Sequence, residues 1–161
     1  MNLNVWVPLA VLGSSLLPGL IIFFLPEDRG ALRTALNMTG AAVKVILVHF
    51  MVYRLLVLGQ IHEVGFGMGL GFAFVLRVDF LSLMFLSLSS NLWLVTTLYA
   101  VGYLEVSPNR SRFFGFFSLC VTATTGIAMA GNPLTLFIFY EFLTLVTYPR
   151  SEERRVGKEC A

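Results

Sequence analysis

Long apolar segments follow one another through most of this chain, and they restrict its fold more than any other feature. They recur at about residues 3–25, 34–58, 79–103, 113–130 and 134–149. A bilayer has a hydrocarbon core about 30 Å thick, which a helix crosses in about 20 residues. Since backbone polar groups in lipid must be satisfied within the chain, such segments predict transmembrane helices. We therefore expect an all-α, multi-pass membrane protein with about five spans.

Composition supports this class and excludes others. Of the 161 residues, 57% are hydrophobic and 12% are charged, which is typical of a multi-pass membrane protein and not of a soluble domain. The formal net charge of +2 is too small to indicate a nucleic-acid partner. The two cysteines, Cys120 and Cys160, make no disulfide framework. No metal-ligand spacing, redox-cofactor motif or catalytic triad is visible, so we expect no cofactor.

One carboxylate, Glu141, lies at the middle of the last apolar segment, LTLFIFYEFLTLVTYP. Insertion scales put a charged side chain at the bilayer centre at a cost of about 2.5–3.5 kcal/mol. Protonation of the carboxylate or a cation from another helix reduces that cost. A group that changes between these two states can carry a proton, which is our interpretation of Glu141. The alternative is a neutral glutamate or a structural polar contact between helices.

Two neighbours of Glu141 are candidates for a supporting role. Thr144 is three residues on, so it shares roughly one helix face with Glu141 and can hold a water beside it. Tyr140 precedes the carboxylate directly.

The second apolar segment contains Lys44 and His49, which are further candidates for proton transfer. Lys44 is either a relay or counter-ion deep in the membrane, or a surface residue if the span starts later. His49 can relay protons as an imidazole, although a hydrogen-bonded packing role is the simpler alternative. Hydroxyl side chains in the fourth segment are expected to hydrogen-bond across helices: Ser118, Thr122, Thr124 and Thr125.

The connections carry three local signals. Residues 59–76 are rich in glycine and predict an extended or re-entrant loop at the membrane surface. Asp79 stands at the start of the third segment, where an acidic residue caps free N–H groups. Gly131-Asn132-Pro133 predicts a tight turn before the fifth segment.

Arginines in the short loops indicate the orientation. The first and third loops hold Arg29, Arg33, Arg110 and Arg112. Because cytoplasmic loops are enriched in Lys and Arg, we expect these loops in the cytoplasm and the N-terminus outside.

The last twelve residues, RSEERRVGKECA, differ in character from the rest. They hold four of the eleven Lys and Arg residues directly after Pro149. The stretch resembles an in-frame translation of a DNA-sequencing adapter, so we expect residues 150–161 to be foreign to the protein. A natural charged terminus is the alternative, and sequencing the gene past Pro149 separates the two.

Residues 77–149 resemble the membrane subunits shared by Mrp-type multisubunit cation/proton antiporters and the proton-pumping arm of NADH:quinone oxidoreductase. The matching motifs are Arg77-Val78-Asp79-Phe80-Leu81-Ser82, Leu98-Tyr99-Ala100-Val101-Gly102-Tyr103-Leu104, Gly131-Asn132-Pro133-Leu134-Thr135 and Phe139-Tyr140-Glu141-Phe142-Leu143-Thr144-Leu145. The chain looks most like the D-type antiporter subunit.

The resemblance implies a fragment of a longer protein with about fourteen spans built on inverted repeats. It divides the chain into residues 1–76, two helices with the glycine-rich loop, and residues 77–149, the start of the antiporter-like domain. It implies that Glu141 handles protons opposite a lysine on a later helix. The implied partners are other subunits of a hetero-oligomeric complex, protons, Na⁺ or K⁺, and the lipid bilayer. The alternatives are a proton-pumping subunit of a respiratory complex and a membrane subunit with a purely structural role.

Overall fold

The computed structural model describes residues 3–26, 28–59, 62–69, 72–103 and 110–156. In chain order these ranges contain five helices and one hairpin: α1 (Leu3–Phe23), α2 (Gly30–Leu58), β1 (His62–Gly69), β2 (Phe72–Val78), α3 (Phe80–Tyr103), α4 (Arg110–Ala128) and α5 (Pro133–Val156). The helical fold class is confirmed. Within the same ranges, α1, α2 and α3 are long and apolar enough to cross a membrane, and α5 contains a shorter apolar stretch, Pro133–Tyr148.

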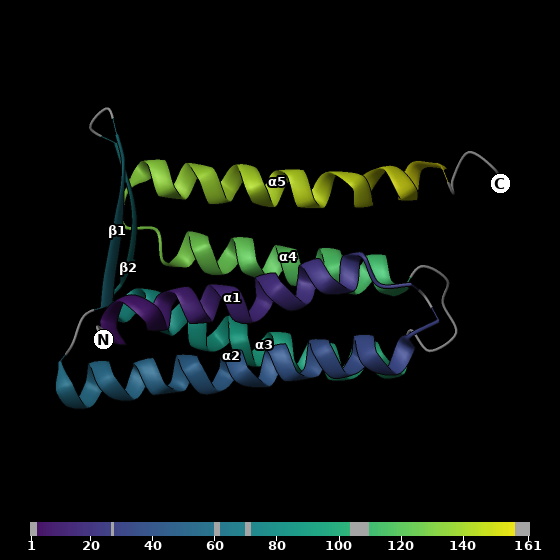
Figure 1. Cartoon of the computed structure of the whole chain (residues 1–161), viewed down its shortest axis with the longest axis horizontal. Coiled ribbons are helices and arrows are strands. Elements are labelled where there is room, and N and C mark those ends of the chain that lie inside the picture. The colour runs from purple at the N-terminus through teal and green to yellow at the C-terminus, as the bar shows by residue number, and fades with distance from the viewer. Residues whose placement is uncertain (1–2, 27, 60–61, 70–71, 104–109, 157–161) are drawn as a thin grey trace.

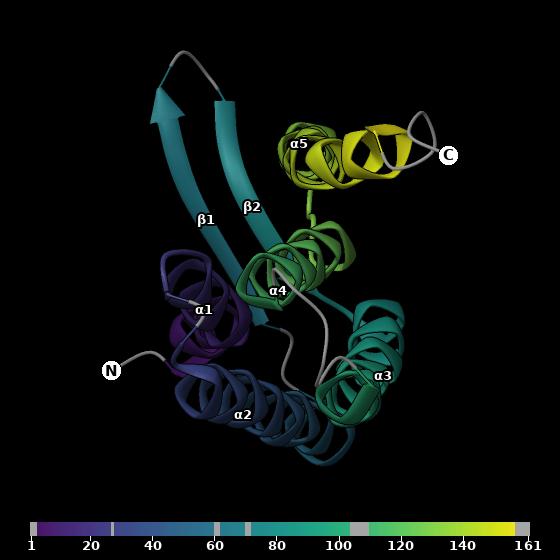
Figure 2. The same cartoon turned by 90° about the vertical axis from the view of Figure 1, so that its right-hand side faces the viewer.

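The helices lie side by side, and successive helices run in opposite directions (Figure 1). Helix α1 packs against α2 and α4, and α2 packs against α3, so these four form a bundle. Viewed down the bundle, α5 lies outside it, beyond α4 and next to β2 (Figure 2). One face of α5 therefore rests on the bundle, while none of the described residues covers the opposite face.

Glycines allow the closest approaches between helices. A Cβ at Gly40 of α2 would lie 2.8 Å from Pro18 Cγ and 2.8 Å from the Ser14 carbonyl oxygen of α1. A Cβ at Gly126 of α4 would overlap the ring of Phe139 on α5. Membrane helices lack a hydrophobic driving force toward one another, so small residues that permit close packing matter at such contacts.

A hairpin replaces the loop that the sequence predicts for residues 59–76. Strands β1 and β2 pair antiparallel, with Val64 opposite Leu76. Val64, Leu76 and Val78 are buried against one end of the bundle. The stretch is extended as expected, but alternation of buried and exposed positions gives it a core-facing side, which the glycine content obscures.

Strand β2 is also fixed to the connection between α4 and α5. The Arg77 amide donates to the Met129 carbonyl at 2.8 Å, and the Gly131 amide donates to the Val75 carbonyl at 2.8 Å. The side-chain amide of Asn132 donates to the Ala73 carbonyl at 2.6 Å, while its oxygen accepts from the Thr135 amide at 2.8 Å. Asn132 thus caps α5 and holds β2 at the predicted turn.

Asp79 caps α3, as its position predicts. Its carboxylate accepts a hydrogen bond from the Ser82 backbone amide at 2.8 Å. That bond lowers the pKa of Asp79 below its usual value, and the Ser82 hydroxyl and the neighbouring Arg77 act in the same direction.

Helix α5 extends beyond the predicted end at Pro149 and continues to Val156. Residues 157–161, with Lys158 and Cys160, lie outside the described residues. The foreign origin of residues 150–161 stays a prediction.

Candidate functional site

Lys44 lies at the centre of the four-helix bundle with none of its side chain exposed. Its Nζ donates hydrogen bonds to Ser15 Oγ of α1 at 3.1 Å and to Thr125 Oγ1 of α4 at 2.5 Å. The same nitrogen is 5.2 Å from the centre of the Trp93 ring of α3. Four helices therefore meet at this one amine. The structure encloses Lys44 in protein and does not place it at a surface.

The partners of Lys44 in the described part of the chain are hydroxyls and an aromatic ring, and none is a carboxylate. A hydroxyl oxygen accepts a hydrogen bond from an ammonium or from a neutral amine. The face of Trp93 favours the charged form by cation–π attraction, worth about 2 kcal/mol in a desolvated setting. The surroundings of Lys44 accordingly suit both protonation states without a change of partner.

Further buried polar groups continue from Lys44 toward the end of the bundle where α2 and α4 begin. Thr122 Oγ1 is 3.0 Å from Ser15 Oγ, and Ser118 Oγ donates to Asn37 Oδ1 at 3.1 Å. At the end itself, Arg33 Nη1 donates to Ser111 Oγ at 3.1 Å. We call this set the polar row; its members are Arg33, Asn37 and Lys44 of α2, Ser15 of α1, and Ser111, Ser118, Thr122 and Thr125 of α4.

The expected interhelical bonds of Ser118, Thr122 and Thr125 are confirmed. The expectation for Thr124 is wrong, because its hydroxyl donates to carbonyls of its own helix. Ser15, Asn37 and Trp93 were not singled out from the sequence. A periodic signal for the row does exist. Positions 33, 37 and 44 are spaced i, i+4 and i+11, and positions 111, 118, 122 and 125 are spaced i, i+7, i+11 and i+14. Each set lies on one face of a helix.

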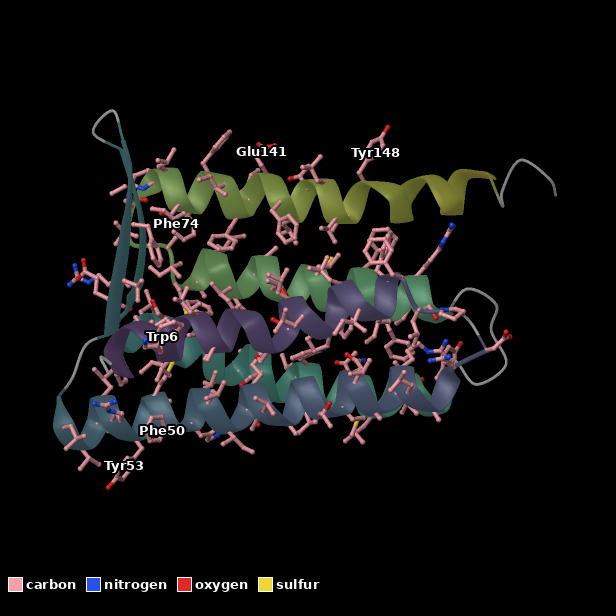
Figure 3. The ribbon with its side chains drawn as sticks, in the orientation of Figure 1. Trp6, Phe50, Tyr53, Phe74, Glu141 and Tyr148 are labelled. Atoms are coloured by element: carbon pink, nitrogen blue, oxygen red, sulfur yellow. The ribbon has the colours of Figure 1, made fainter. Side chains whose placement is uncertain are left out.

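Glu141 lies near the middle of the apolar stretch Pro133–Tyr148 and is exposed in this chain. Figure 3 shows its carboxylate projecting from α5 on the side away from α4, as Tyr148 does. Thr144 is also exposed, and its hydroxyl donates to the Tyr140 carbonyl at 3.0 Å. Polar groups thus collect on the uncovered face of α5, and the described residues supply no cation to Glu141.

The structure does not bring the predicted proton-transfer residues together. Glu141 faces away from α4, whereas Lys44 is enclosed on the other side of α4 by α1, α2 and α3. His49 is exposed on α2, and its Nδ1 is 2.8 Å from the Val45 carbonyl of the same helix. The transfer roles of all three residues stay predictions.

Comparisons with known proteins agree on a class of membrane subunit. Residues 66–114 match the sequence profile of the family described as NADH-Ubiquinone oxidoreductase (complex I), chain 5 N-terminus. The chain is 34% identical over 80 residues to the L subunit of NADH-quinone oxidoreductase from Mycobacterium tuberculosis, covering 50% of this chain and 13% of that protein.

Two further relatives are antiporter subunits by name. The chain is 26% identical over 133 residues to the A/B subunit of a probable K(+)/H(+) antiporter from Rhizobium meliloti, covering 80% of this chain and 13% of that one. It is 30% identical over 78 residues to the A1 subunit of a Na(+)/H(+) antiporter from Staphylococcus aureus, and the match covers 48% of this chain and 10% of that subunit. The resemblance to antiporter and respiratory subunits is confirmed, while the finer expectation of a D-type subunit is not.

A solved structure shares the fold. The structure of the membrane-bound sulfane sulfur reductase, an archaeal respiratory membrane complex, aligns with a TM-score of 0.68 at 19% identity. The alignment covers 86% of this chain and 21% of that one. The present chain therefore corresponds to a small part of each of these proteins, and its apolar helices place it among membrane proteins.

Proposed function

We propose that this chain is part of a membrane subunit of a monovalent cation/proton antiporter complex, in which Glu141 takes up and releases the transported proton. The observation that carries the proposal is the position of Glu141, a carboxylate in the middle of an apolar helix and turned away from its own bundle. Ionisable residues inside membranes face protein or water and mark ion pathways as a rule.

The uncovered face of α5 supports a partner outside the described chain. Glu141 is an ionisable group that lipid would not solvate, so protein or an aqueous cavity has to cover it. The antiporter and respiratory relatives are many times longer than their matched parts and have ample sequence for such a cover. A cation on another helix would stabilise the ionised carboxylate and leave the protonated form unaided.

Lys44 supports the same function as a second protonatable group in the membrane. Its polar partners are hydroxyls, which serve the amine with or without the proton. His49 is the weaker third candidate, because its ring bonds to its own helix.

A second candidate is a proton-translocating subunit of a quinone-linked respiratory complex. The observation that favours it is the 34% identity to the L subunit from Mycobacterium tuberculosis. Vesicles separate the two functions. An antiporter exchanges Na⁺ or K⁺ for protons without an electron donor, whereas a respiratory pump moves protons only while a donor is oxidised.

The decisive experiment measures cation-dependent proton flux in vesicles that contain the complete complex with the full-length subunit. Glu141→Gln is expected to reduce exchange to the level of vesicles without the complex. The matched control is Glu63→Gln, a change of the same chemistry at an exposed position on β1 outside the apolar helices. Undiminished exchange in Glu141→Gln would contradict the assigned role. Lower assembly with normal flux per assembled complex would instead indicate a structural subunit.

The N-terminus is proposed to lie outside. This orientation places the ends of α2 and α4 that carry Arg33 and Ser111 on the cytoplasmic side. An impermeant reagent that labels an N-terminal tag only in permeabilised cells would contradict it.

A further inference from the structure

The polar row is enclosed by protein along its length. Ser15, Asn37, Lys44 and Ser118 are fully buried, and Arg33, Ser111, Thr122 and Thr125 are 1–3% exposed. Its hydrogen bonds form three groups, which follow one another from the buried amine of Lys44 to the end of the bundle where α2 and α4 begin: Lys44 with Ser15, Thr122 and Thr125, then Ser118 with Asn37, then Arg33 with Ser111. A membrane bundle has no need of so many polar groups on one line, because apolar side chains pack between helices without hydrogen-bond requirements.

Buried polar atoms beside the row lack partners. Asn37 Nδ2, Trp93 Nε1 and Thr97 Oγ1 have no hydrogen-bond partner among the described residues. Each of these side chains is at most 2% exposed. A buried donor left without a partner costs about 1–3 kcal/mol, and internal water is the usual remedy where several polar groups converge. Asn37 belongs to the row, Trp93 faces Lys44, and Thr97 lies one turn after Trp93 on the same face of α3. These three atoms point to bound water.

We propose that the polar row is a hydrated path through which Lys44 exchanges its proton with the end of the bundle marked by Arg33 and Ser111. The presence of water in the row does not depend on the function proposed above. The transfer of protons along the row does rest on that proposed function. The step is a proton transfer alone. The proton leaves Lys44 Nζ for Ser15 Oγ or an adjacent water, each hydroxyl passes on its own proton, and one proton emerges at the end.

The chemistry of the row fits this task. A hydroxyl donates one hydrogen bond and accepts others, so a chain of hydroxyls and waters can pass a proton in either direction. The row receives hydroxyls from α1 and α4 and the Trp93 ring from α3. The charged groups that face it in the described chain are Lys44 and Arg33, both on α2. With no carboxylate in the row, nothing along it would hold the proton between the two ends.

The test uses cysteine accessibility in the full-length subunit within its complex. Ser118→Cys is made in a background where Cys120 and the other cysteines of the full-length subunit are alanine, and sealed vesicles of either orientation are exposed to Ag⁺. Unreacted thiols are then counted by maleimide labelling after denaturation. Thr124→Cys is the matched control, because Thr124 lies on the same helix but outside the polar row, exposed in the groove between α3 and α4.

A thiol reacts as the thiolate, which forms in water and not in a dry interface. We expect Ag⁺ to block Ser118→Cys from the Arg33 side at least about tenfold faster than from the hairpin side, and faster than it blocks Thr124→Cys from the Arg33 side. Equal rates at positions 118 and 124 would overturn the proposal in favour of dry packing. Reaction only from the hairpin side would also overturn it, because access would then run along the groove between α3 and α4 that Asp79, Ser82 and Thr125 line.

A second pair of variants tests whether protons are transferred along the row. Thr122→Val is nearly isosteric and removes one hydroxyl of the row, and Thr124→Val removes a hydroxyl outside it. Proton uptake by the complex is expected to slow several-fold in Thr122→Val and to stay unchanged in Thr124→Val. Equal uptake would overturn the transfer role. Since Ag⁺ access is measured without transport, a failure of the Glu141 proposal and a failure of the hydrated path give different results.

Discussion

The Nζ of Lys44 lies 5.2 Å from the centre of the Trp93 ring, so a buried cation of α2 rests on the aromatic face of α3. Helices α1 and α4 complete the enclosure with Ser15 and Thr125. The amine is thus held by neutral groups from three helices. Because its partners are neutral, the contribution of Lys44 to stability can be measured separately from its role in proton transfer.

Lys44→Met should preserve the fold and abolish the proton function. Removal of one buried charge is costly mainly when it leaves an opposite charge unpaired, and the partners of Lys44 are neutral. The hydroxyls of Ser15 and Thr125 keep bonds to the Leu12 and Val121 carbonyls of their own helices, so neither is left without a partner. Thermal unfolding and cation-dependent proton flux of the purified complex measure the two effects.

Val43→Met is the control for Lys44→Met, because it places the same side chain at an exposed position of α2. It should change neither property. A large fall in the melting temperature of Lys44→Met would show that the amine is needed for packing.

Asn132→Ala should destabilise the junction of α5 and β2. The substitution removes a cap on the Thr135 amide and a bond to the Ala73 carbonyl. We expect the free energy of unfolding to fall by about 1–2 kcal/mol. Asn91→Ala removes an exposed asparagine whose side-chain amide donates to the Ser87 carbonyl of the same helix, and should change stability by less than about 0.5 kcal/mol. Equal effects of the two variants would argue against the junction.

Gly126→Ala should loosen α5 from α4. The added Cβ overlaps the Phe139 ring, and overpacking of this kind costs about 1–3 kcal/mol. Gly13→Ala is the opposite case, since no atom lies within 4 Å of the new Cβ, and it should be neutral or stabilising by up to about 1 kcal/mol. Combining Gly126→Ala with Phe139→Leu should recover part of the loss in a double-mutant cycle by thermal unfolding.

Asp79 should make the stability of the α3 start depend on pH in the acidic range. Its folded pKa is lowered by the Ser82 amide, and an unfolded Asp titrates near about 3.9. The stabilisation is therefore complete above the unfolded pKa and is lost as the pH falls through the folded pKa. The difference in melting temperature between the native protein and Asp79→Asn should be small, because water screens this exposed group. The difference in melting temperature should shrink below about pH 4. A difference that does not change with pH would contradict the capping role of the Asp79 carboxylate.

Sequence reasoning placed the helix ends within about four residues, except the end of α5, which continues past Pro149 to Val156. Length and apolar content suffice for that in a membrane protein. The capping role of Asp79 and the turn at Asn132 were also predicted, since both depend on neighbours along the chain. The hairpin was missed because its stability comes from contacts with Met129 and Gly131, which lie about fifty residues away in the chain.

The sequence by itself determined that the chain is helical and apolar, and that Glu141 and Lys44 stand inside apolar segments. Only the tertiary structure decided which way each side chain turns: Lys44 into the bundle, His49 outward from the same helix, and Glu141 away from α4. The physical reason is the solvent. In a bilayer the outer and inner faces of a helix are both apolar, so the hydrophobic period that orients a helix in a soluble protein is weak. The direction of each side chain is set instead by the helices that pack against it, which come from distant parts of the chain.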